Sequence, residues 1–159
     1  MITSESVDEA CSEINGYTDD RMMKEFDAFF KEQPSICDFI TELTSESSMR
    51  IQELALFMSY MVFKAIKIGM PQGVSPVSPE TLEAAYKESE SWIERIDQGA
   101  EVSDMPVDTE PYLIQYVISE LNQPLEDGAL LEDEQKGEVF FVLKTVISSL
   151  TRSPLGKET

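Results

Sequence analysis

Residues 54–70, LALFMSYMVFKAIKIGM, decide the fold, because they combine length with an almost wholly apolar composition. Lys64 and Lys67 interrupt the segment, so it falls short of the roughly 20 consecutive apolar residues that a membrane-spanning helix needs. We therefore predict a helix from about Met49 to Ile68, ended by Gly69 and buried at the centre of a folded domain.

Helical spacing of apolar residues also dominates the rest of the chain. No stretch alternates apolar and polar residues long enough to indicate a strand. The sequence predicts an all-α fold, a single compact domain of six or seven helices over residues 1–152, followed by a frayed C-terminal tail over residues 153–159. The other helices are expected over about residues 4–15, 19–33, 36–43, 79–97, 110–121 and 132–150.

Local signals predict where several helices begin and end. Thr18, Ser35 and Thr109 are expected to cap the helices that follow them, because a hydroxyl can accept a hydrogen bond from a free backbone N–H group. Pro34 is expected to end the second helix, and Ser78 with the proline after it to start the fifth.

The same spacing predicts which side chains point inward. In the second helix the expected buried stripe consists of Met22, Met23, Phe26, Phe29 and Phe30. In the sixth helix it consists of Leu113, Ile114, Val117, Ile118 and Leu121. Phe57 and Phe141 are expected in the core of the long apolar helices. The methionines on or beside the fourth helix are interpreted as gap fillers in the core more readily than as a methionine-rich binding groove; they are Met49, Met58, Met61 and Met70.

Two helical hairpins of similar pattern are expected to build most of the core. An offset of 78 residues superposes Ile36, Phe39, Ile40, Glu42 and Leu43 on Ile114, Val117, Ile118, Glu120 and Leu121. An offset of 85 superposes the apolar positions of residues 53–62 on those of residues 138–147. Internal duplication and two independent amphipathic hairpins both explain this match.

Charge and composition exclude several classes of function. The 159 residues include 31 acidic and 12 basic ones, which gives a formal net charge of −19. Direct binding to nucleic acid or to an acidic membrane surface is not expected from this balance. Histidine is absent, which removes histidine-dependent catalytic triads and zinc sites.

The cysteines and the first residues predict a cytoplasmic protein. Residues 1–10 hold three acids and no basic residue, unlike the basic start of a secretory signal. Cys11 and Cys37 are far apart and form no CxxC pair, so both are expected to be free thiols that act as small core side chains.

Carboxylates are the only abundant catalytic groups. The pairs Glu80/Glu83 and Glu94/Asp97 have a spacing that resembles the ExxE and ExxD pairs of all-α nucleotide pyrophosphohydrolases, which bind magnesium. Here both pairs fall on one expected helix, so four ligands cannot converge on one ion, and we interpret them as a solvated acidic face. The acidic segment 126–134 lacks the spacing of a calcium loop and is interpreted as a loop followed by a helix start.

No other motif indicates a catalytic or cofactor site. Glycine-rich phosphate loops and a GxSxG nucleophile turn are missing from the sequence. A serine nucleophile would need a lysine base, although the lysines are expected mostly on helix exteriors. We therefore assign no catalytic, cofactor-binding or metal-binding residues from the sequence.

Three hypotheses for function remain. The first is a non-enzymatic acidic adaptor or chaperone-like protein that acts through contacts with a protein partner. The second is an inhibitor that imitates the phosphates of DNA and occupies a basic nucleic-acid-binding protein. The third, a carboxylate–metal enzyme, requires acids at inward positions, whereas nearly all acids here fall on polar helix faces.

Overall fold

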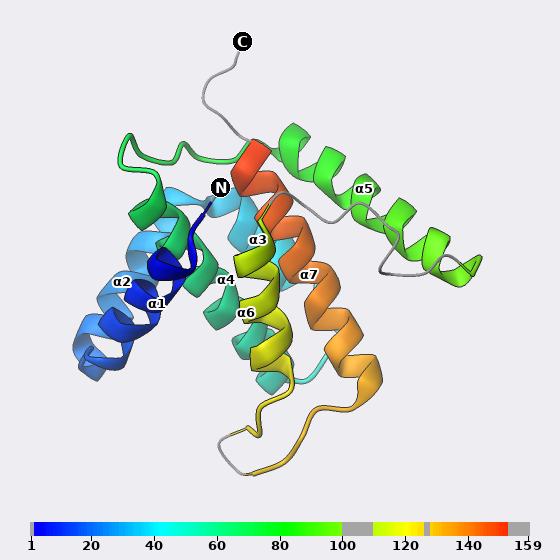
Figure 1. Ribbon diagram of the computed structural model, residues 1–159, viewed down its shortest axis with the longest axis horizontal. Helices are drawn as coiled ribbons and strands as arrows, with labels where there is room; N and C mark the ends of the chain where they lie inside the picture. Colours follow the sequence, from blue (N-terminus) through cyan, green and yellow to red (C-terminus); the bar gives the residue numbers. More distant parts are fainter. Residues whose placement is uncertain (1, 100–109, 126–127, 153–159) are drawn as a thin grey trace.

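The computed structural model describes residues 2–99, 110–125 and 128–152, and within these ranges it contains seven α-helices and no strand (Figure 1). The all-α prediction is therefore confirmed. The helices are α1 (Ser4–Asn15), α2 (Asp19–Glu32), α3 (Pro34–Leu43), α4 (Met49–Gly69), α5 (Pro79–Asp97), α6 (Pro111–Leu121) and α7 (Asp133–Arg152). No helix in the described ranges is long and apolar enough to cross a membrane.

Hydroxyl caps begin α2 and α5 as the sequence predicts. Thr18 Oγ1 accepts a hydrogen bond from the Arg21 N–H group at 3.1 Å, and Ser78 Oγ accepts one from the Thr81 N–H group at 3.1 Å. The prediction that Ser35 caps α3 is wrong, because α3 already begins at Pro34. The ring of proline suits the first position of a helix, where no N–H group is needed.

Further helix-end predictions have different outcomes. Gln33 lies between α2 and α3 and is the N-cap residue of α3, although its side chain makes no capping hydrogen bond there. The predicted cap Thr109 and the predicted tail over residues 153–159 lie outside the described residues.

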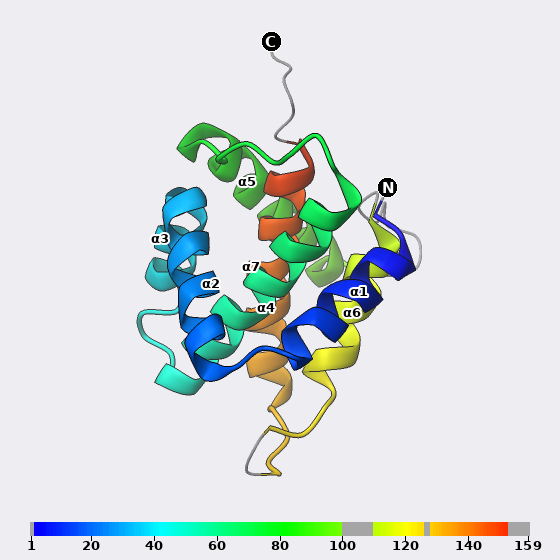
Figure 2. The same ribbon diagram turned by 90° about the vertical axis from the view of Figure 1, so that its left-hand side faces the viewer.

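The helices form three layers. Figure 2 shows α4 and α7 in the middle, with α2 and α3 on one side and α1 and α6 on the other. α5 packs mainly against α7, on the side away from α1 (Figure 1). The predicted apolar helix, α4, therefore lies at the centre of the bundle, and α7 shares that position.

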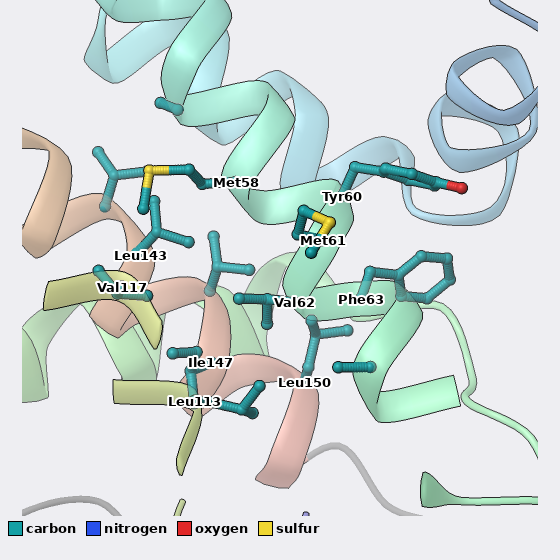
Figure 3. Close-up of a cluster of buried hydrophobic side chains, with 14 of the residues drawn as sticks. Met58, Tyr60, Met61, Val62, Phe63, Leu113, Val117, Leu143, Ile147 and Leu150 are labelled. Carbon is teal, nitrogen blue, oxygen red and sulfur yellow. The ribbon is translucent and has the colours of Figure 1, made fainter. Parts of the chain in front are cut away.

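The core lies where α4, α6 and α7 meet. Figure 3 shows Met58 and Val62 of α4 close to Leu143 and Ile147 of α7, with Val117 of α6 beside them. All five side chains are fully buried. Met58 and Met61 are buried and fill gaps in the core as predicted, and Met70 is half-buried against it. The prediction is wrong for Met49, which is the first residue of α4 and is 72% exposed.

Some side chains that were predicted to point inward lie on the surface. Met23 is 67% exposed, Phe30 43% and Ile118 47%. In α2 the inward stripe is narrow and runs through Phe29, with Met22 and Phe26 half-buried. Met23 and Phe30 each follow a stripe residue by one position, which turns them about 100° around the helix axis.

The same one-residue offset corrects the two predicted core phenylalanines. Phe57 and Phe141 are only half-buried. Their chain neighbours Met58 and Val142 occupy the fully buried positions instead. Both phenylalanines therefore border the core, and the buried stripe of each long helix is centred one residue further along the chain.

The two predicted hairpins are present as packed helix pairs, since α3 contacts α4 and α6 contacts α7. Their burial differs at equivalent positions, most clearly at one pair. Ile40 of α3 is fully buried, whereas its counterpart Ile118 of α6 is exposed. The internal duplication itself stays a prediction.

Candidate functional site

A groove of about 650 Å³ runs between α3 and the start of α5. Its floor is apolar and consists mainly of Phe39, Leu43, Leu82 and Tyr86. Its rim is acidic and consists of Asp38, Glu42, Glu80 and Glu83. We call this depression the acidic groove.

Helical spacing produces this arrangement on both walls. On α3, Asp38 and Glu42 are four residues apart and share one side of the helix, as do Phe39 and Leu43 beside them. The opposite side of α3 buries Ile36 in the core. One helix therefore presents an acidic stripe and an apolar stripe to the groove while a third stripe holds it to the bundle.

Aromatic rings fix the floor from three helices. The rings of Phe39 in α3 and Tyr86 in α5 meet edge to face at 6.1 Å between centroids, and those of Tyr86 and Phe141 in α7 at 5.5 Å. This geometry is the favourable one for aromatic pairs. Burial and the neighbouring Glu90 carboxylate raise the pKa of the Tyr86 hydroxyl, so it stays protonated and neutral at physiological pH.

Gln33 sets the relative position of the two walls. Its side chain is fully buried, and Nε2 donates a hydrogen bond to the Ser75 carbonyl oxygen at 3.0 Å. The Val77 N–H group donates to Gln33 Oε1 at 2.8 Å. Gln33 immediately precedes α3, and Val77 lies two residues before α5, so one amide joins the starts of both walls.

A second depression of about 450 Å³ continues the acidic groove toward the start of α7. It shares Glu42 and Leu43 with the acidic groove and adds Glu46, Glu134 and Glu138, which brings the carboxylates of the two depressions to seven. The Ser47 hydroxyl donates a hydrogen bond to the Glu138 carboxylate. Among the described residues, no lysine or arginine lines either depression.

The rim carboxylates have few basic neighbours. Glu83 lies 3.9 Å from Lys87 Nζ, and both side chains are about 70% exposed, at 69% and 71%. Within the described part of the chain, Asp38, Glu42 and Glu80 take part in no ion pair. The groove is therefore a region of negative potential that the basic side chains of the described ranges leave largely unneutralised.

A cleft of about 240 Å³ between α2 and α4 has the opposite character. Lys67 Nζ lies 3.2 Å from Glu32 Oε1, and the Tyr60 hydroxyl donates to Glu25 Oε1 at 2.7 Å. Lys64, which also lines this cleft, pairs with Glu13 at 3.1 Å. We call it the paired cleft.

The hydrogen bonds at the paired cleft change the acidity of Glu25. The Tyr60 hydroxyl, and after it the Arg21 guanidinium, lower the pKa of the Glu25 carboxyl, although partial burial opposes them. The Arg21 guanidinium also lies 4.5 Å from the centre of the Tyr17 ring. The Glu25 carboxylate therefore accepts hydrogen bonds from a phenol and from an arginine whose guanidinium lies over an aromatic ring.

The structure separates the two carboxylate pairs that the sequence singled out on α5. Glu80 and Glu83 lie on the rim of the acidic groove, whereas Glu94 and Asp97 are exposed near the other end of the helix. No three acidic or cysteine side chains of the described residues lie close enough together to hold a metal ion. Part of the calcium-like segment, residues 126–127, is outside the described ranges.

Sequence reasoning missed the facing wall of the groove. Asp38 and Glu42 carry a usable signal, since their spacing of four residues on a short amphipathic helix places two like charges on one face. The juxtaposition of that face with the start of α5 is a tertiary contact, and no local pattern encodes it.

Lys144 is an exception to the expectation that most lysines lie on helix exteriors. Its side chain is only 5% exposed, with Nζ 5.4 Å from the centre of the Trp92 ring. The cysteines behave as predicted, since both are free. Cys37 is buried, and burial raises the pKa of its thiol to about 12, whereas Cys11 is half-buried.

Comparison with known proteins adds no relative: no family model, no curated protein and no solved structure matches the chain.

Proposed function

We propose that this chain is a non-enzymatic interaction protein, an adaptor or chaperone-like module, that binds a protein partner through the acidic groove. The observation that carries the proposal is the uncovered floor of the groove. Phe39, Leu43, Leu82 and Tyr86 line a depression of about 650 Å³ that no other element of the described chain fills. Concave apolar surfaces rimmed by polar residues are typical of binding sites.

The chemistry of the lining favours binding over catalysis. Besides carboxylates, the acidic groove offers one serine hydroxyl, from Ser35, and one phenol, from Tyr86. Burial raises the pKa of that phenol, which makes it a poor base near neutral pH. Among the described residues, no hydrogen bond joins the Ser35 hydroxyl to a carboxylate or a lysine that could activate it as a nucleophile.

A second candidate function is an inhibitor that imitates the phosphates of DNA. The seven carboxylates along the two adjoining depressions favour it. The concave shape and the aromatic floor favour the adaptor, because a DNA mimic needs its acids in rows on a convex surface.

Site-specific photo-crosslinking in cells tests the proposed function. A photoreactive amino acid replaces either Ser35 on the groove or Asp27 on the exposed side of α2, which is the matched control. We expect a protein adduct from position 35 and none from position 27. Equal adducts from both positions, or none from position 35, would contradict the proposal.

Capture of the partner from lysate without crosslinking, at low and at high salt, separates the two candidates. A partner held through apolar contacts stays bound at high salt, because salt does not weaken those contacts. Complete release of a nucleic-acid-binding protein at high salt would favour the DNA mimic instead.

A further inference from the structure

We infer that the segment that fills the acidic groove is a basic peptide of the partner, with lysine or arginine side chains on both sides of an apolar anchor residue. This inference rests on the proposed function and specifies the chemistry of the partner.

Charge complementarity is the first argument. Asp38 and Glu42 belong to α3, and Glu80 and Glu83 belong to the first two turns of α5, so carboxylates border the groove on both sides. Lys87, next to Glu83, is the only basic ion-pair partner of these four in the described chain. A neutral or acidic segment would bring no compensating charge, whereas a basic one pairs with both rims at once.

The floor requires an apolar residue between the basic ones. Phe39 and Tyr86 meet at the bottom of the groove, with Leu43 and Leu82 beside them. A purely basic segment would leave these side chains in contact with water. An apolar anchor buries them, and a lysine or arginine over an aromatic ring adds a cation–π contact.

The molecule already contains this combination elsewhere. Arg21 Nε lies 3.3 Å from Glu25 Oε2 while its guanidinium stacks on the Tyr17 ring. In the acidic groove the carboxylates and the tyrosine are present without the arginine. A partner arginine there would make the same two contacts, with the planar fork that suits carboxylates.

The adjoining depression extends the binding surface. It shares Glu42 and Leu43 with the acidic groove and adds Glu46, Glu134 and Glu138 along the same path. We therefore expect the basic character of the bound segment to continue on the side of Glu42, toward the start of α7.

Selection from a random-peptide display library tests the inference with the full-length protein as bait. We expect the enriched peptides to contain several lysines or arginines around a leucine or an aromatic residue. Each is then measured by fluorescence anisotropy against the wild type and two charge-matched variants. The groove variant carries Asp38→Asn, Glu42→Gln, Glu80→Gln and Glu83→Gln, and the control variant Glu9→Gln, Asp27→Asn, Glu94→Gln and Asp97→Asn.

The two variants change the net charge equally, so they separate a local site from general attraction to an acidic protein. Exposed ion pairs contribute modestly one by one, and we expect the loss of four to weaken binding about tenfold or more in the groove variant and less than about threefold in the control. Equal weakening in both variants would overturn the inference. Leu43→Ala should also weaken binding, because it removes part of the floor.

The outcomes distinguish this inference from the proposed function. Enriched peptides that are neutral and apolar, and that still need Leu43, would refute the basic partner and leave a groove-binding adaptor. A library that yields no peptide, together with self-association of the wild type in sedimentation, would mean that a second copy fills the groove and would overturn the inference. If the enriched peptides bound the groove variant and the Leu43→Ala variant as tightly as the wild type, both the inference and the proposed function would be contradicted.

Discussion

The paired cleft and the acidic groove are both depressions with aromatic floors and glutamates on their walls. They differ in whether basic side chains of the described residues lie opposite those acids. In the paired cleft, α4 supplies Lys64 and Lys67 opposite the acids of α1 and α2. In the acidic groove, α3 and α5 both supply acids. Among the described residues, basic side chains therefore pair with acids at the paired cleft, whereas Lys87 alone pairs with an acid of the acidic groove.

The largest difference between the two sites should appear in the stability of their floors. Phe29 of the paired cleft is only 1% exposed, so Phe29→Ala should lower the free energy of unfolding by about 3–5 kcal/mol. Leu43 of the acidic groove is half-buried, and Leu43→Ala should cost roughly 1 kcal/mol. Chemical denaturation measures both. Equal costs would mean that the groove floor is part of the core and not a free surface.

Replacing Gln33 should damage the acidic groove and leave the paired cleft intact. Gln33→Leu deprives the buried Val77 N–H group of its acceptor, which should lower the free energy of unfolding by about 1–3 kcal/mol. Amide hydrogen exchange should accelerate at the starts of α3 and α5. Faster exchange in α2 and α4 as well would show that Gln33 supports the whole bundle instead of the two walls.

Acid should weaken the paired cleft. The folded-state pKa of Glu25 is lowered, so its contribution to stability is complete above the unfolded-state value of about 4.3 and is lost as the pH falls through the folded-state pKa. Glu25→Gln should therefore lower the free energy of unfolding by about 1 kcal/mol at neutral pH and by less in acid. Denaturation of both proteins across this range measures the difference, and a constant difference would contradict the assignment.

The smallest expected changes in the free energy of unfolding come from single surface charges and have opposite signs at the two sites. Asp38 and Glu42 are like charges four residues apart, so Glu42→Gln should raise the free energy of unfolding by a few tenths of a kcal/mol, about 0.2–0.5. Lys67→Gln should lower it by a similar amount, about 0.2–1 kcal/mol, because it removes an exposed ion pair. Added salt should reduce both differences. If both substitutions changed the free energy of unfolding in the same direction, the contrast between the two sites would be contradicted.

Most of the fold could be predicted from the sequence because helical periodicity and end signals are local. The predicted helix Met49–Ile68 differs from α4 by one residue, and the fifth, Pro79–Asp97, has the bounds of α5. The errors concern which face of a helix points toward the core, as for Met23, Phe30 and Ile118. A run of adjacent apolar residues fits several orientations of one helix, and only tertiary packing selects one.

Less of the candidate site could be predicted. Glu80 and Glu83 stood out because of their ExxE spacing near the start of α5, but the acids across the groove come from α3. That meeting depends on Gln33, whose buried amide joins two segments more than 40 residues apart in the sequence, at separations of 42 and 44. Nothing in the local sequence distinguishes this glutamine from a solvated one.

Binding of a basic segment to the acidic groove is tested most directly by nuclear magnetic resonance titration of the isotope-labelled protein with a selected basic–apolar peptide. We expect saturable chemical-shift changes that centre on Phe39, Leu43 and Tyr86, that disappear in the groove variant and that leave the amides around Lys64 in the paired cleft unchanged. Changes centred on the paired cleft, or spread evenly over the acidic surface, would contradict a defined site between α3 and α5.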